Sequence, residues 1–150
     1  DTALGPASIS VDAATLRSRD VAPFEAAFGE GAPGVVVSNA IFTAYDPVTP
    51  ASLAPEVLDG LLRRELGFEG VAITDELEAG AIRAGRKTPD AAVEAVRSGA
   101  DMVQLAEPES IAPVRSALLA AAESGEISTD RLDSAAGRVL EMKQKLGLLE

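Results

Sequence analysis

Three acidic residues follow a single apolar run in the middle of the chain. The run Val71-Ala72-Ile73 leads through Thr74 to Asp75, and Glu76 and Glu78 follow closely. Asp75 is the strongest single candidate for a reactive side chain, because the neighbouring carboxylates create local negative charge that can shift its pKa. The alternative is that Asp75 caps a short helix beginning near Leu77. Position alone leaves both interpretations open.

The absence of two residue types narrows the possible chemistry. The chain contains no His and no Cys, which excludes disulfides, thiolate chemistry and the commonest general acid/base. The acidic residues do not have the spacing of a Ca²⁺ loop, so we expect neither a metal nor another cofactor. Carboxylates, Lys, Arg and the single Tyr45 remain as groups that can titrate.

The charge balance excludes whole classes of partner. With 24 Asp and Glu against 13 Lys and Arg, the formal net charge is -11, which opposes nucleic acid and anionic membrane surfaces. No apolar run is long enough to cross a bilayer, and the start lacks the layout of a signal peptide, so we expect a soluble chain. Because the chain begins with Asp1 rather than Met, we expect that upstream residues were removed. The compartment stays open between the cytoplasm and the bacterial cell envelope or secretion.

Length and apolar patterning predict one α/β domain over residues 1–150. Apolar runs bounded by turn residues predict buried strands near 35–39, 70–75 and 101–106. Helical patterns alternate with them, which predicts parallel strands joined by right-handed crossovers. Three such strands fit either the tail of a TIM-type (β/α) barrel, which closes with eight, or a small open sheet. Periodicity does not decide between these two.

The predicted helices have recognisable ends. We expect helices over 20–28, from Pro55 to Gly67, from Thr88 to Gly99, before Gly125, and from an N-cap at Ser128 to Gly147. The fourth helix carries an inward stripe of Ile111, Val114, Leu118 and Ala121. The last helix opens with a hydrophobic staple of Ile127 and Leu132, and its stripe continues through Ala136, Val139, Leu140 and Leu146.

In either architecture, reactive side chains gather at the carboxyl ends of the strands, here Ser38 and Asn39, residues 74–78, and residues 106–109. Asp101 opens its strand at the opposite end, where we expect a structural role. Tyr45, with Phe42 nearby, serves either packing or sugar stacking. The turn over 67–70 follows a helix and precedes a strand, so it is a connection and not a phosphate cradle. The basic residues, Arg63 among them, are predicted to lie on solvated helix faces.

Several segments resemble glycoside hydrolase family 3, and in particular its bacterial β-N-acetylhexosaminidases. They are residues 50–57, 61–78, 95–103 and 128–148, and the most specific is LGFEGVAITDEL at 66–77. The likeness runs from about the first residue to the last. It implies that residues 1–150 are the C-terminal part of the family's (β/α)-barrel domain, with about three of its eight strands. It also implies that carbohydrate is the ligand.

The resemblance implies that Asp75 is the nucleophile of a retaining glycosidase. Such enzymes need a second group about 5 to 5.5 Å away that protonates the leaving oxygen and later activates water. In the hexosaminidase branch that group is an Asp-x-His dyad in a mobile loop, and our alignment places Gly5 and Ala7 at the dyad's positions. Neither residue can move a proton. This chain therefore lacks an acid/base at the place where the resemblance implies one.

Other departures lie at the same end of the barrel. Ser38-Asn39 stands where relatives have Ser-His, Glu76 stands where they have a second Asp, and Ala79 stands where they often have Met. We expect Asn39 and Glu76 to contact the substrate. Three readings follow: part of a working glycosidase completed by the missing barrel fragment, a non-catalytic carbohydrate-binding relative, or a half-barrel that self-associates as a homo-oligomer.

Overall fold

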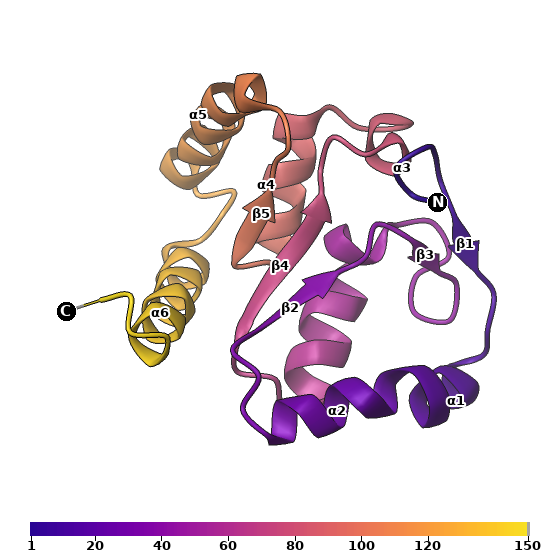
Figure 1. The fold of residues 1–150 in the computed structure, drawn as a ribbon. Coiled ribbons are helices and arrows are strands. Elements are labelled where there is room, and N and C mark those ends of the chain that lie inside the picture. Colours follow the sequence, from indigo (N-terminus) through magenta and orange to yellow (C-terminus); the bar gives the residue numbers. More distant parts are fainter. Residues whose placement is uncertain (150) are drawn as a thin grey trace.

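The central element of the structure is a parallel sheet of three strands. The computed structural model describes residues 1–149 and contains β2 (Gly34–Val37), β4 (Val71–Glu76) and β5 (Met102–Gln104), ordered β2-β4-β5 (Figure 1). Gly34 pairs with Val71 and Ile73 with Met102. The three predicted strands are confirmed, and so is their parallel arrangement in one sheet.

A second, smaller sheet was not predicted. β1 (Ser8–Ile9) pairs in parallel with β3 (Ile41–Phe42), and the Ile41 amide donates to the Ala7 carbonyl at 2.8 Å. Strands of two residues are too short to display the alternation on which sequence-based recognition depends. This small sheet ties the first residues of the chain to the segment that follows β2.

Helices connect the strands and largely follow the predicted boundaries. They are α1 (Ala13–Thr15), η1 (Leu16–Val21), α2 (Ala22–Gly29), η2 (Ala51–Leu53), η3 (Glu56–Glu65), α3 (Gly80–Arg83), α4 (Thr88–Ser98), α5 (Pro108–Ser124) and α6 (Thr129–Lys145). The first helical stretch begins earlier than residue 20, because Asp12 caps α1. No helix within residues 1–149 combines the length and apolar content needed to cross a membrane.

The predicted glycines end α4 and α5, and the predicted serine begins α6. Gly99 after α4 and Gly125 after α5 have φ of 126° and 79°, a region that other residues enter at a cost. Ser128 caps α6, with its hydroxyl accepting from the Arg131 amide at 3.2 Å. Ile127 and Leu132 pack in one cluster, which confirms the hydrophobic staple.

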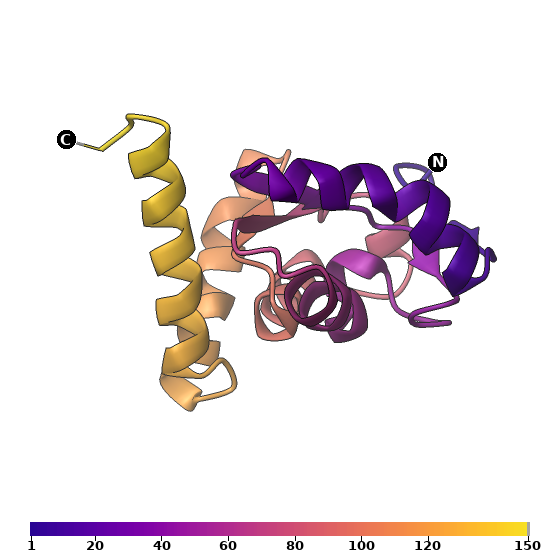
Figure 2. The same cartoon turned by 90° about the horizontal axis from the view of Figure 1, so that it is seen from below.

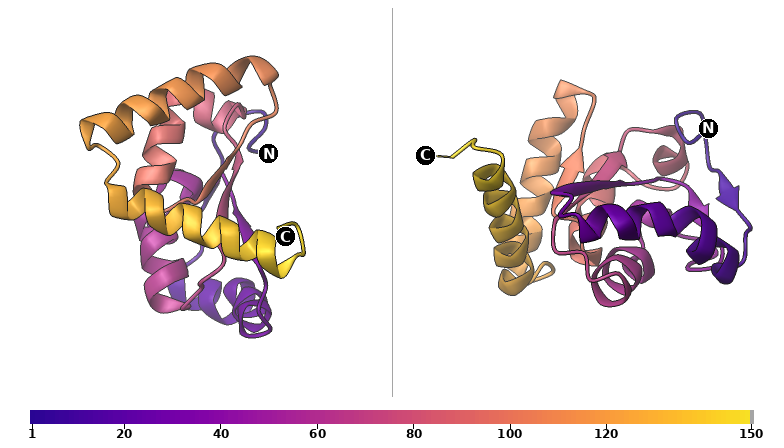
Figure 3. Two further views of the ribbon diagram at one scale, coloured as in Figure 1. Left: turned by 90° about the vertical axis from the view of Figure 1, so that its left-hand side faces the viewer. Right: turned by 60° about the horizontal axis from the view of Figure 1, so that its bottom comes forward.

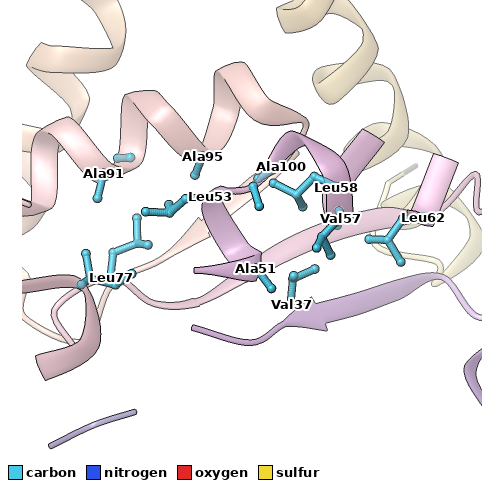
Figure 4. Packing of buried hydrophobic residues seen from close by; sticks show 14 of the residues in the cluster. Val37, Ala51, Leu53, Val57, Leu58, Leu62, Leu77, Ala91, Ala95 and Ala100 are labelled. Atoms are coloured by element: carbon cyan, nitrogen blue, oxygen red, sulfur yellow. The ribbon is translucent and has the colours of Figure 1, made fainter. Parts of the chain in front are cut away.

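The main core lies between one face of the sheet and the helices η2, η3 and α4 (Figure 4). Leu53 and Leu58 are fully buried there, and truncating such a leucine to alanine typically costs about 2 to 5 kcal/mol. On α4 the inward residues Ala91 and Ala95 are small, so the helix approaches closely. A side chain at Gly99 would lie 3.1 Å from Leu58 Cβ, which explains a glycine there as well.

The opposite face of the sheet is open. Figure 1 shows η3 behind the sheet and no helix across the near face of β2 and β4. The pairing register sets Val36, Ile73 and Met102 side by side on this face, and Val36 is 57% and Met102 37% exposed. In a closed barrel such residues fill the interior. β2 and β5 each have one edge that pairs with no other strand of this sheet. The sheet is therefore open, as expected for a segment of a barrel.

Two predicted apolar stripes are partly wrong. On α5, Val114 and Ala121 are buried but Ile111 is exposed. On α6, the buried residue is Ala135, whereas Ala136, Leu140 and Leu146 are exposed. Figures 2 and 3 show α6 at one flank of the molecule, where only one side of it can meet the rest of the chain. Much of the apolar surface of α6 therefore has no counterpart within residues 1–149.

Candidate active site

The predicted site residues come together at the carboxyl ends of β2 and β4. Both arrowheads in Figure 1 point toward α3, on the side where the N-terminus lies. Asn39 follows β2, while Asp75 and Glu76 are the last residues of β4. Asn39 Nδ2 donates a hydrogen bond to the Glu76 carbonyl oxygen at 2.7 Å, and this bond joins the two strand ends directly. The structure thus assembles the three residues that the sequence singled out.

The pairing of β4 with β5 is irregular at this point. Ile73 pairs with Met102, but the next pair is Glu76 with Gln104, so β4 has one extra residue. The Gln104 amide donates to the hydroxyl of Thr74 at 3.0 Å, and the Leu77 amide donates to the Gln104 carbonyl at 3.1 Å. Such bulges redirect side chains and often lie beside active sites. Neighbouring residues of an unbroken strand, such as Asp75 and Glu76, would point to opposite sides, and this bulge interrupts that alternation.

Asp75 is half-buried at the bulge. Its Oδ1 accepts a hydrogen bond from the Glu76 amide at 2.8 Å. The helix-cap interpretation of Asp75 is wrong, because α3 begins only at Gly80 and its N-cap residue is Ala79. Within residues 1–149 no Lys or Arg forms an ion pair with Asp75. A carboxylate that is held at one oxygen and unpaired with a cation can act as a nucleophile.

Asn39 is buried completely, and its amide is engaged at both ends. Nδ2 donates to the Glu76 carbonyl, and Oδ1 accepts from the Ser52 hydroxyl at 2.6 Å. Through the first of these bonds, the buried Asn39 is connected to the backbone of Glu76 at the end of β4. Ser52 was missed by sequence reasoning, since nothing in its local pattern sets it apart from other small residues.

Two further carboxylates border the site. Glu78 is only 4% exposed, its Oε2 accepts from the Ala106 amide at 3.2 Å, and its buried Oε1 has no partner within residues 1–149. Glu107 is exposed and pairs with Arg83 at 2.5 Å. The hydrogen bond to Arg83 lowers the pKa of Glu107, and the same bond raises the pKa of Arg83. Glu107 is therefore held in its charged form.

The N-terminal segment packs against α3. The Gly80 amide donates to the Ala3 carbonyl at 3.0 Å, and the Ala81 amide donates to the Thr2 carbonyl at 2.9 Å. A Cβ on Gly80 would come within 2.6 Å of the Leu4 backbone, so this approach requires glycine. The segment with Gly5 thus lies beside the first helix after Asp75, and neither Gly5 nor Ala7 has a side chain that can transfer a proton.

Asp101 lies at the other end of the sheet, in the structural role predicted for it. Its side chain is fully buried, with Oδ2 accepting from Arg63 at 2.6 Å and from the Ala72 amide at 3.0 Å. Arg131 and Arg138 of α6 pair with Oδ1. The expectation that Arg63 is a solvated surface residue is wrong, because its side chain is only 12% exposed.

Tyr45 and Phe42 line an apolar groove of about 220 Å³ next to the free edge of β2. Burial raises the pKa of Tyr45, and its buried hydroxyl has no hydrogen-bond partner within residues 1–149. Both rings pack against the main core. This supports the packing interpretation over sugar stacking.

The described part of the chain, residues 1–149, has no cluster of three or more acidic side chains arranged to hold a metal ion. The chemistry that the site offers is that of carboxylates at a strand end. In a parallel sheet flanked by helices, that edge is where catalytic groups are found.

Comparison with known proteins decides the family. The model described as "Glycosyl hydrolase family 3 N terminal domain" matches residues 1–142. The chain belongs to glycoside hydrolase family 3. A family 3 β-N-acetylglucosaminidase from Paenibacillus sp. str. FPU-7 superposes with a TM-score of 0.95 at 37% identity, over 99% of this chain and 28% of that one. The partial TIM-type (β/α)-barrel fold predicted from the sequence is thereby confirmed.

Other family 3 proteins match in the same way. A β-N-acetylhexosaminidase from Beutenbergia cavernae DSM 12333 superposes with a TM-score of 0.85 at 32% identity, over 96% of this chain and 43% of that one. A β-hexosaminidase of Stenotrophomonas maltophilia strain K279a is 31% identical over 73% of this chain. The matched part of the chain spans only 31% of that enzyme's length.

Proposed function

We propose that this chain is the nucleophile-bearing part of a retaining hydrolase of β-N-acetylglucosaminides, with Asp75 as the nucleophile. The observation that carries the proposal is the half-buried Asp75 carboxylate at the carboxyl end of β4, free of any ion pair within residues 1–149. The names of the relatives, β-hexosaminidase and β-N-acetylglucosaminidase, support the substrate class.

In the first step, an Asp75 oxygen attacks the anomeric carbon and forms a glycosyl ester while the bond to the leaving oxygen breaks. The leaving oxygen takes up a proton. Water then attacks the anomeric carbon and gives up a proton while the bond from that carbon to the Asp75 oxygen breaks, which releases the sugar and the free carboxylate. The Glu76 amide, which donates to Asp75 Oδ1 at 2.8 Å, holds that oxygen, so Oδ2 is the one that would attack. Glu76 is the proposed substrate-side residue at the same strand end, and the buried Asn39 supports it through its carbonyl.

The test is an Asp75→Asn variant assayed against an aryl β-N-acetylglucosaminide. We expect that any turnover by the chain, alone or combined with a fragment that supplies the rest of the barrel, is lost in this variant. Asp90→Asn is the matched control, because it makes the same chemical change on the exposed first turn of α4. Turnover that survives Asp75→Asn and falls in Asp90→Asn contradicts the proposal.

A second candidate function is self-association or completion by a partner. The open face with Val36 and Met102, the free edge of β2 and the exposed Leu140 of α6 are apolar surfaces that a monomer leaves in water. We propose that they are covered by a second copy of the chain or by the missing barrel strands. Sedimentation that shows a compact monomer at high protein concentration counts against coverage by a second copy.

A further inference from the structure

We propose that Asn39 is a positioning residue that fixes the backbone around Asp75 and thereby the direction of the nucleophilic carboxylate. The inference rests on the proposed role of Asp75. It deepens that role by assigning the geometry of the nucleophile to a residue on a different strand, 37 positions earlier in sequence than the Glu76 carbonyl that it binds.

The first observation is the complete engagement of the Asn39 amide. The residue has no exposed surface, and its Nδ2 lies 2.7 Å from the Glu76 carbonyl oxygen. Its Oδ1 accepts from the Ser52 hydroxyl at 2.6 Å, and Ser52 is itself fully buried. The Ser52 amide in turn donates to the Ser38 carbonyl at 3.0 Å. The amide is therefore fixed in orientation by groups that are fixed themselves.

The second observation is the position of the residue that Asn39 holds. Glu76 is the pair of Gln104 at the register shift of β4, where the regular ladder is interrupted. The Glu76 amide donates to Asp75 Oδ1 at 2.8 Å, while the Glu76 carbonyl accepts from Asn39. The backbone of Glu76 is thus hydrogen-bonded to Asp75 through its amide and to Asn39 through its carbonyl. A change in the backbone of Glu76 moves the group that orients Asp75.

The size of the expected effect follows from geometry. A misplacement of about 1 Å in a catalytic group can cost about 100-fold in rate. Losing Asn39 relaxes the bulge but leaves the Gln104 to Thr74 bond in place, so we expect a smaller displacement. The expected loss is about 10-fold in kcat, with KM within about twofold, because Asn39 is fully buried and would not itself contact the sugar.

Three variants separate hydrogen bonding from packing. Asn39→Leu keeps a side chain of similar reach and removes both hydrogen bonds. Asn39→Asp keeps the acceptor for Ser52 but loses the donor to Glu76 when ionised. When the introduced carboxyl is protonated, its O–H supplies the donor again. Val114→Ala, which truncates a buried side chain on α5, is the control for general destabilisation.

The structural readout is the ¹³C chemical shift of the Glu76 carbonyl, together with hydrogen exchange of the Leu77 amide. We expect Asn39→Leu to shift the carbonyl signal and speed exchange at Leu77 at every pH. In Asn39→Asp the same changes should appear at high pH and reverse as the pH falls. Val114→Ala should leave the carbonyl signal unchanged. A folded Asn39→Leu with the wild-type carbonyl shift overturns the proposal, as does an Asn39→Asp signal that does not move with pH.

The activity readout is hydrolysis of an aryl β-N-acetylglucosaminide by the same proteins, with the rest of the barrel supplied where the chain alone has no turnover. If wild type shows no Asp75-dependent turnover even then, the proposed function fails, and the Glu76 carbonyl shift still decides whether Asn39 holds the bulge. If wild type turns over and Asn39→Leu lowers kcat by about 10-fold with KM unchanged, Asn39 positions the nucleophile. An unchanged kcat, alongside a shifted carbonyl signal, overturns the positioning role.

Discussion

The guanidinium of Arg63 meets the carboxylate of Asp101 at 2.6 Å, although the two residues are 38 positions apart in sequence. Arg63 also donates to the carbonyls of Phe68 and Gly70 at 2.6 and 2.7 Å. The pair therefore joins η3, the turn before β4, and the start of β5. Arg131 and Arg138 add α6 to the same carboxylate. One buried acid organises the end of the sheet that lies opposite the candidate active site.

Asp101→Asn should destabilise the chain strongly. Removing one partner of a buried ion pair leaves the other charge uncompensated, which typically costs about 3 to 5 kcal/mol. Here three arginines would lose their shared counter-charge. Urea unfolding followed by circular dichroism measures the loss. Glu107→Gln, which removes a carboxylate from an exposed pair, serves as the control and should leave the midpoint nearly unchanged.

Gly80→Ala should release the N-terminal segment from α3. The new Cβ would lie 2.6 Å from the Leu4 carbonyl carbon, which is backbone and cannot turn aside. We expect proteolysis within residues 1–11 to become faster. Gly137→Ala is the matched control, because no atom lies within 4 Å of its Cβ position in α6. That control should stabilise the helix by about 0.5 to 1 kcal/mol. Equal proteolysis rates in the two variants would contradict the role assigned to Gly80.

The pKa of Glu107 should lie below the ordinary glutamate value of 4.5, because Arg83 donates a hydrogen bond to it. A carboxyl with a lowered pKa in the folded chain contributes stability above its unfolded value. That contribution is lost as the pH falls through the folded value. Titration of the side-chain carboxyl by ¹³C NMR measures the pKa directly. Arg83→Gln should raise it toward 4.5, and a titration curve that does not move would show that Arg83 is not the cause.

The isolated chain should hydrolyse unactivated β-N-acetylglucosaminides negligibly. General acid catalysis is worth about 10²- to 10⁴-fold, and neither Gly5 nor Ala7 can supply it. Aryl glycosides with good leaving groups need less protonation, so residual turnover that depends on Asp75 should appear with them first. Parallel assays of an aryl glycoside and a natural disaccharide make the comparison. Robust cleavage of the disaccharide that is lost in Asp75→Asn would mean that another group acts as the acid. Of the two carboxylates that border the site, Glu78 is then the candidate, because Arg83 lowers the pKa of Glu107.

Local patterns in the sequence determined much of the scaffold. The strands around Val36, Ile73 and Met102 were predicted because buried parallel strands are short apolar runs between turn residues. The helix ends at Gly99 and Ser128 were predicted because a left-handed backbone and an N-cap each favour particular residue types. Asp75 was found in the same way, since it ends a buried strand.

Tertiary structure decided whatever depends on residues distant in sequence. No local pattern indicates that Asn39 binds the Glu76 carbonyl or that Arg63 is buried against Asp101, because each pairing joins separate elements. The bulge at the end of β4 appears only through its pairing with β5, so the sequence of β4 alone does not reveal where the alternation of its side chains is interrupted. Burial along α6 likewise depends on which side of the helix meets the sheet. Local residue preferences determine where elements begin and end, and the packing of distant elements determines which side chains share a site.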